Sequence, residues 1–170
     1  MPLLSLIPLD QVAAAQLAAD PAAFASRHQL TLAPHEDTVI GIAGATAEML
    51  TKRPAPAPWI GYLALEGSAR RLVGTCGFNG APDATGTVEI AYFAFPGEEG
   101  RGVASAMAVA LVQLASDARP SISGVCAHTL PERNASCRVL EKTGFRFVGP
   151  AIDPDDGPVW RWEQSIAGAD

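Results

Sequence analysis

The chain has 170 residues, of which 48% are hydrophobic and 18% charged, and these values predict a single globular domain and argue against a disordered chain. Its formal net charge of −6, with only 12 scattered lysines and arginines, argues against a nucleic-acid-binding protein. Cys76, Cys126 and Cys137 show no C-x-x-C spacing, so no metal site or disulfide framework is predicted and a reducing, cytoplasmic location is favoured.

The apolar N-terminal stretch Leu3–Leu9 predicts a strand. It lacks the basic start of a signal peptide, and Pro8 interrupts it. No apolar run elsewhere in the chain approaches the roughly 18 residues of a membrane helix. We therefore expect neither a signal peptide nor a membrane span.

Two helices are expected to follow this strand. Asp10 is a helix-capping residue before the alanine-rich stretch Gln11–Ala19, and Pro21 is expected to end that helix. A second helix is expected over Glu36–Lys52. Three prolines then make Arg53–Pro58 a stiff, non-helical connector.

The rest of the chain predicts a sheet interrupted by two helices. Three strand-like runs separated by short turns indicate an antiparallel meander, and two strands close the chain around an acidic turn. The helix that follows Gly102 is apolar on all its faces, which predicts burial on more than one side. A shorter helix ends at Gly144. The strands expected here are Trp59–Glu66, Arg71–Asn79, Gly86–Phe95, Ile122–His128, Phe145–Gly149 and Val159–Gln164.

This order of elements predicts an α/β (α+β) fold, with a mixed, mostly antiparallel sheet of six to seven strands flanked by helices. The step from Val88 through Val125 is strand, helix, strand. Such a crossover is right-handed and makes its two strands parallel, so one parallel pair is expected within the sheet.

The strongest chemical feature is the sequence FPGEEGRGVASA, between a strand and the buried helix. Gly97, Gly100 and Gly102 allow positive φ, so successive backbone N–H groups can point into one concavity. The start of the helix adds unpaired N–H donors and a partial positive charge, and Arg101 adds a side-chain charge. This predicts a phosphate or pyrophosphate site. The turn lacks the lysine of an NTPase loop, and too little chain follows it for a doubly wound dinucleotide domain. Two alternatives remain: the turn binds the pyrophosphate of coenzyme A, or it binds no ligand.

Two motifs carry a family resemblance. The segment EGRGVA, Glu99–Ala104, matches an R/Q-x-x-G-x-G/A turn, and NASCRVLEKTGF, Asn134–Phe145, follows it at the expected separation. From Trp59 to Trp162 the chain thereby resembles the GNAT superfamily of N-acetyltransferases, and most closely its branch of ribosomal-protein N-terminal acetyltransferases (RimJ/RimL-like). The resemblance implies one N-acetyltransferase domain over residues 1–170. Residues 1–58 would form the acceptor side, and residues 59–165 the cofactor-binding core.

The resemblance also implies the site. The strand Val88–Phe95 would carry a bulge and splay away from Ile122–His128, so that the pantetheine arm of acetyl-coenzyme A pairs with its backbone like an added strand. The pyrophosphate would lie on the glycine-rich turn, and the thiol end would approach the helix that begins at Asn134. The cofactor-binding residues implied are Phe93, Ala94, Phe95, Gly100, Arg101, Gly102, Val103, Ala104, Ser105 and Asn134.

Two positions depart from the family pattern. Glu99 replaces the usual arginine or glutamine of the turn, so its carboxylate is expected to point away from the phosphates. Leu140 stands where many members carry a tyrosine that protonates the leaving thiolate. In the branch resembled here a serine of this helix is the usual substitute, and Ser136 matches it. The alternative for Ser136 is a helix-start residue that bonds backbone N–H groups.

Glu89 is the candidate base that removes a proton from the amine, directly or through a water, because it lies on the central strand near the expected thioester. Its alternative is a strand glutamate that faces solvent or forms a salt bridge. His128 ends a neighbouring strand and is either a base or acid, or a hydrogen-bonded structural histidine. A backbone N–H near Phe93 is a candidate oxyanion donor.

The function expected is transfer of the acetyl group from acetyl-coenzyme A directly to a primary amine, on a protein N-terminus or a small molecule. The alternative is a non-catalytic GNAT-like module that binds coenzyme A or a partner, and a dinucleotide oxidoreductase ranks third. Homodimers are common in the family resembled, but the sequence leaves the acceptor and the oligomeric state open.

Overall fold

The computed structural model describes residues 1–118 and 121–166, and residues 167–170 of the predicted domain lie outside this part. The described part contains seven strands and five helices. The strands are β1 (Leu4–Leu9), β2 (Gly61–Glu66), β3 (Arg71–Phe78), β4 (Thr87–Ala94), β5 (Gly124–Thr129), β6 (Arg146–Asp153) and β7 (Gly157–Ser165). The helices are α1 (Gln11–Ala19), α2 (Pro21–His28), α3 (Glu36–Lys52), α4 (Val103–Asp117) and α5 (Ala135–Lys142).

The seven strands form one sheet in the order β1-β2-β3-β4-β5-β7-β6. All neighbours are antiparallel except β4 and β5, which are parallel. The predicted α/β fold with one central parallel pair in a mostly antiparallel sheet is therefore confirmed. The parallel pair arises because α4 carries the chain back across the sheet between its two strands.

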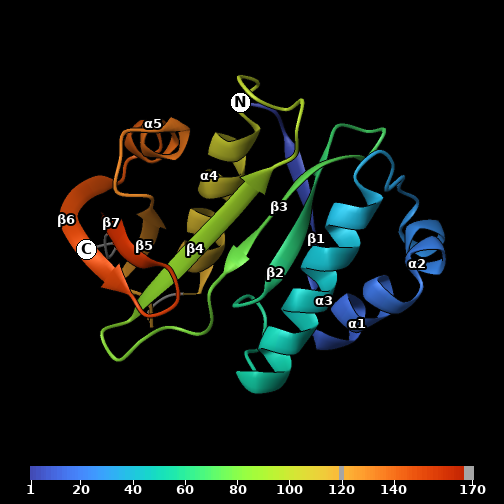
Figure 1. The fold of residues 1–170 in the computed structure, drawn as a ribbon, viewed down its shortest axis with the longest axis horizontal. Coiled ribbons are helices and arrows are strands. Elements are labelled where there is room, and N and C mark those ends of the chain that lie inside the picture. Colours follow the sequence, from blue (N-terminus) through green and yellow to red (C-terminus); the bar gives the residue numbers. More distant parts are fainter. Residues whose placement is uncertain (119–120, 167–170) are drawn as a thin grey trace.

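Helices cover both faces of the sheet, with α3 on one side and α4 on the other (Figure 1). Two apolar cores result. One joins α1, α2 and α3 to β1 and β2, with Leu17, Val39 and Leu63 completely buried. The other surrounds α4, whose Met107 and Leu111 are completely buried, as the all-apolar helix predicted. No helix in the described residues combines the length and apolarity needed to cross a bilayer.

The structure differs from the sequence prediction at Pro21. Asp10 caps α1 as expected, and its carboxylate accepts a hydrogen bond from the Ala13 N–H at 2.8 Å. Pro21 ends this helix but also begins α2, which Asp20 caps through the Ala23 N–H at 3.0 Å. Proline suits a first helical position because the N–H it lacks would have no partner there.

Candidate active site

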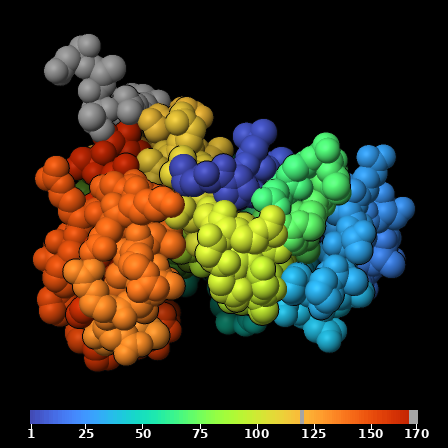
Figure 2. Space-filling view, turned by 90° about the horizontal axis from the view of Figure 1, so that it is seen from above, coloured from blue at the N-terminus to red at the C-terminus, as the bar shows by residue number. Residues whose placement is uncertain are grey.

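The sheet opens between β4 and β5. Their pairing covers only three residue pairs, from Thr87–Gly124 to Glu89–Cys126. Beyond them β4 continues to Ala94 and β5 to Thr129 without pairing to each other, which confirms the predicted splay. Figure 2 shows a hollow between the orange C-terminal part and the yellow turn that precedes α4. The predicted bulge is wrong for the β3–β4 pairing, which runs from Gly74–Ala94 to Phe78–Ile90 without a register shift.

This register decides which backbone groups of β4 face the opening. Asn79 donates its N–H to the Glu89 carbonyl at 2.9 Å, and Phe95 donates its N–H to the Val73 carbonyl at 3.0 Å. Bonding alternates along an antiparallel strand, so the odd-numbered residues between them, Phe93 included, also bond to β3. The groups that face the splay are those of the even-numbered residues Tyr92 and Ala94. The expectation that the Phe93 and Phe95 backbones pair with a ligand, and that the Phe93 N–H forms an oxyanion hole, is corrected accordingly.

The glycine-rich turn has the backbone geometry that the sequence predicted. Gly97, Gly100 and Gly102 have φ of 91°, 74° and 81°, in the left-handed region that favours glycine. Gly102 is the N-cap of α4 and makes no side-chain cap bond. The N–H groups of Val103, Ala104 and Ser105 therefore begin the helix without a capping side chain. The turn and the start of α4 fit a phosphate group.

The side chain of Glu99 folds back within this turn. Its carboxylate accepts a hydrogen bond from the Gly97 N–H at 2.8 Å. The carboxylate is thus held at the first residue of the turn. The N–H groups predicted to hold the pyrophosphate lie later, over residues 100–105.

Arg101 belongs to an ion-pair network under the turn. Its guanidinium bonds Glu98 at 2.8 Å and Glu66 at 3.0 Å. Arg71, from the start of β3, pairs with the same two carboxylates. Glu98 is only 6% exposed, and Arg71 is the main cause that lowers the pKa of its carboxyl. The network holds the turn against the ends of β2 and β3, so the charge of Arg101, which was expected to serve the phosphate site, is shared with two carboxylates.

Glu89 and His128 come together across the parallel pair. The Glu89 Oε1 and His128 Nδ1 atoms are 2.8 Å apart, and Asn79 Nδ2 donates to the other Glu89 oxygen at 3.3 Å. The side chains of Glu89 and His128 are 28% and 17% exposed, so both are partly screened from water yet accessible. Such an arrangement orients a carboxylate and can pass on a proton that it takes up.

The first turn of α5 lies near this pair. Asn134 is its N-cap, and its side-chain oxygen accepts a hydrogen bond from the Cys137 N–H at 3.1 Å. The capping role, considered for Ser136, thus belongs to Asn134, whose amide N–H groups remain for other partners. Leu140 is completely buried in the core around α4.

One cavity of about 450 Å³ lies beside the Glu89–His128 pair. Its lining includes Glu89, Tyr92, His128 and Ser136. Residues of α3 also line it, namely Ile42, Thr46 and Met49. The end of β6 and the acidic turn that follows it add Asp153, Asp155 and Asp156 to the lining. No lysine or arginine of the described residues lines this cavity.

Sequence reasoning did not identify three of these contributors. Tyr92 and Asn79 escaped it because neither belongs to a recognisable motif, although the meander register would have placed Asn79 opposite Glu89. The acidic turn was visible in the sequence, but only the β6–β7 hairpin brings it to the cavity.

One family matches the sequence: the acetyltransferase (GNAT) domain matches residues 3–146. No curated protein matches the chain significantly.

Solved structures share the fold at low sequence identity. A spermidine N-acetyltransferase chimera built from Vibrio cholerae and human enzymes is 14% identical, with a TM-score of 0.65 over 96% of this chain and 95% of that one. The aminoglycoside acetyltransferase AAC(6')-Ib in complex with coenzyme A and kanamycin is 18% identical, with a TM-score of 0.66 over 96% and 95%. The ribosomal-protein α-N-acetyltransferase RimL in complex with coenzyme A is 16% identical, with a TM-score of 0.64 over 96% and 94%.

Proposed function

Because the chain belongs to the GNAT acetyltransferase family, we propose that it transfers the acetyl group of acetyl-coenzyme A directly to a primary amine. One observation carries the proposal. The phosphate-binding turn and the Glu89–His128 pair lie toward opposite ends of the same splayed strand, β4. A ligand that lies along this strand can therefore have its phosphates at the turn and its reactive end near the carboxylate.

The free backbone groups support a position for the cofactor. The N–H groups of Gly100 and of residues 102–105 are proposed to hold the pyrophosphate, because the Arg101 N–H already donates to the Glu98 carbonyl at 3.4 Å. The backbone groups of Tyr92 and Ala94 are proposed to pair with the pantetheine arm. Acetyl-coenzyme A supplies a thioester, whose carbonyl carbon is the electrophile. Phe93, which is 47% exposed, and the Asn134 amide are further contacts that we propose for it.

Glu89 takes the proton that the amine must lose to attack. His128 holds one carboxylate oxygen and Asn79 the other, so the carboxylate keeps one orientation. Ser136 is a proposed hydrogen-bond donor to the leaving sulfur. This division of roles is consistent with direct transfer, in which amine and thioester occupy the site together.

The acceptor is proposed to carry positive charge. Glu89 and the three aspartates of the β6–β7 hairpin line the cavity, and a cationic amine is attracted by such a lining. Spermidine, which gives one fold neighbour its name, and kanamycin, which is bound in another, are of this kind, whereas RimL acts on a protein. A small cationic amine is the leading candidate, and the RimJ/RimL-like branch with a protein N-terminus is the other.

The division of the domain stays a proposal of the same kind. Leu9, Ile42 and Met49 line the cavity, which supports an acceptor side formed by residues 1–58. Residues 59–165 hold the turn, the splay and α5. Cys76, Cys126 and Cys137 are buried and free, which supports a cytoplasmic location. A homodimer stays a prediction.

Two measurements test the proposed function. Calorimetry with acetyl-coenzyme A tests binding, and release of free thiol over a panel of polyamines, aminoglycosides, amino acids and peptides tests transfer. We expect micromolar binding and acceptor-dependent thiol release. Absence of binding at millimolar cofactor would overturn the proposal. Binding without turnover on any acceptor would favour the non-catalytic module, which Glu99 and Leu140 also favour.

A further inference from the structure

The hydroxyl of Tyr92 is a buried polar group without an assigned role. Its oxygen is out of contact with solvent and has no hydrogen-bond partner among the described residues. Buried hydroxyls in folded proteins are nearly always bonded, and an unpaired one is unfavourable. The strand could carry a phenylalanine here at no loss of packing. The hydroxyl therefore calls for a functional explanation.

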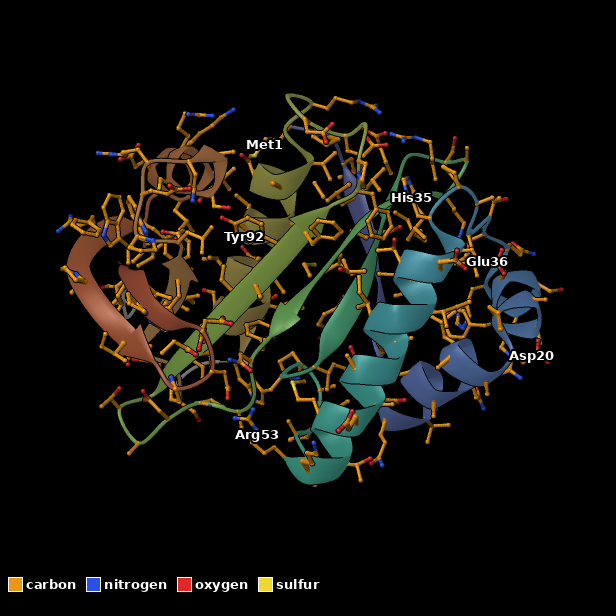
Figure 3. All side chains as sticks on the ribbon, viewed as in Figure 1. Met1, Asp20, His35, Glu36, Arg53 and Tyr92 are labelled. Atoms are coloured by element: carbon orange, nitrogen blue, oxygen red, sulfur yellow. The ribbon has the colours of Figure 1, made fainter. Side chains whose placement is uncertain are left out.

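The position of this hydroxyl is specific. Tyr92 projects from β4 toward the side of the molecule where α5 lies (Figure 3). Ser136, in the first turn of α5, lies against the phenol closely enough to affect its ionisation, although the two hydroxyls do not meet in hydrogen-bond geometry. Both side chains line the cavity that also holds Glu89. The phenol is thus at the end of the splay where the thiol of the cofactor is proposed to lie.

We propose that Tyr92 donates a hydrogen bond to the sulfur of coenzyme A as the thiolate leaves, an inference that rests on the proposed function. The amine nitrogen forms a bond to the thioester carbonyl carbon with its lone pair, and Glu89 accepts the amine proton. The carbon–sulfur bond then breaks, and its electron pair stays on sulfur. The phenol keeps its proton throughout, and the thiolate gains one from solvent after release.

The ionisation of Tyr92 agrees with a donor that stays protonated. Burial is the largest influence and raises the pKa of Tyr92, whereas the contact with Ser136 acts in the opposite direction. A phenol with a raised pKa remains a hydrogen-bond donor at neutral pH. Leu140 cannot substitute for it, because it is apolar and completely buried in the core.

The test measures the thiol of bound coenzyme A, and not only turnover. The ultraviolet absorbance of the thiolate, followed against pH in the complex, reports the pKa of the bound thiol. We expect Tyr92→Phe to raise this pKa by about one unit, because loss of a hydrogen bond to a charged group weakens thiolate binding about tenfold or more. Desulfo-coenzyme A, which has no thiol, should bind both proteins equally. kcat should fall while KM for acetyl-coenzyme A stays unchanged.

Tyr62→Phe is the matched control. Tyr62 also lines the cavity, but its hydroxyl donates to the Pro58 carbonyl at 2.8 Å. The control should leave the pKa of the bound thiol unchanged. If Tyr92→Phe binds coenzyme A with the wild-type thiol pKa, Tyr92 is structural and this inference alone is overturned. If the wild-type protein binds no coenzyme A, the proposed function fails and the inference fails with it.

Discussion

The replacement Glu98→Gln tests whether the ion-pair network holds the glycine-rich turn in place. Glu98 bonds Arg71 and Arg101, and both guanidinium groups also bond Glu66. Glutamine keeps the shape of the side chain but removes the negative charge between the two arginines. The turn should then lose its attachment to the start of β3, because one carboxylate remains for two cations.

The size of the effect follows from burial. Removing one partner of a buried ion pair destabilises a protein by about 3–5 kcal/mol, whereas an exposed pair contributes about 0.2–1 kcal/mol. Glu98 is 6% exposed, but Arg71 and Arg101 are 43% and 45% exposed, so water screens the arginines. We expect a loss between these limits, about 2 kcal/mol, which corresponds to a decrease in Tm of about 4–8 °C for a chain of this length.

The pH dependence of this loss adds a second check. Arg71 lowers the pKa of the Glu98 carboxyl below its ordinary value of 4.5. The stabilisation is therefore complete above pH 4.5 and disappears as the pH falls through the lowered pKa. Urea and thermal unfolding of both proteins between pH 3 and 7 should show a difference in stability that shrinks toward acid.

Glu48→Gln serves as the control for these unfolding measurements. Glu48 pairs with Lys52 at 2.6 Å, but both side chains are about two-thirds exposed or more, at 67% and 71%. Its replacement should leave Tm nearly unchanged. Equal effects of the two replacements, or a Glu98→Gln difference that does not change with pH, would refute the structural role given to Glu98.

Three further predictions concern the site and the sheet. Glu89→Gln should lower kcat about 100-fold or more and remove the rise of activity with pH that a base causes, while the glutamine amide can still bond His128. An unchanged pH–rate profile would exclude Glu89 as the base. Gly102→Glu should abolish coenzyme A binding in calorimetry, because it adds a carboxylate at the phosphate turn and a side chain at a left-handed backbone position. Gly102→Ala adds only the backbone strain, so it should bind more weakly than wild type but measurably. Gly77→Ala should destabilise the protein by about 1–3 kcal/mol in urea unfolding, because its Cβ would lie 2.7 Å from the Gly61 Cα; a smaller loss would mean that the strands separate readily.

Local sequence signals predicted most of the fold. Glu36–Lys52 was predicted with the bounds that α3 has, because acidic residues suit its first turn and the prolines after Arg53 end it. The predictions of a helix cap at Asp10 and of a positive φ at Gly102 were likewise correct, because both features depend on few neighbouring residues. The prediction at Pro21 was only half correct, because a proline can follow the end of one helix and also occupy the first position of the next.

The site was predictable only where it depends on a local motif. The turn was found because three glycines mark it. The pairing of Glu89 with His128 joins residues 39 positions apart, and it depends on the register of two parallel strands that no local pattern specifies. The ion pair between Arg101 and Glu66 was unpredictable for the same reason, because the two residues are 35 positions apart and no local pattern joins them.

The short β4–β5 pairing makes the sheet two blocks joined by a narrow strip. One block is β1 to β4, the other β5 to β7, and only three residue pairs connect them within the sheet. A pantetheine arm bonded in the opening would act as a partial eighth strand that ties the blocks together. Unfolding of the two blocks should then become more cooperative with ligand bound, in addition to the mass-action stabilisation of about 2.7 kcal/mol at a hundredfold excess over Kd. The substrate of such a protein is also, for the length of one catalytic cycle, a structural part of its sheet.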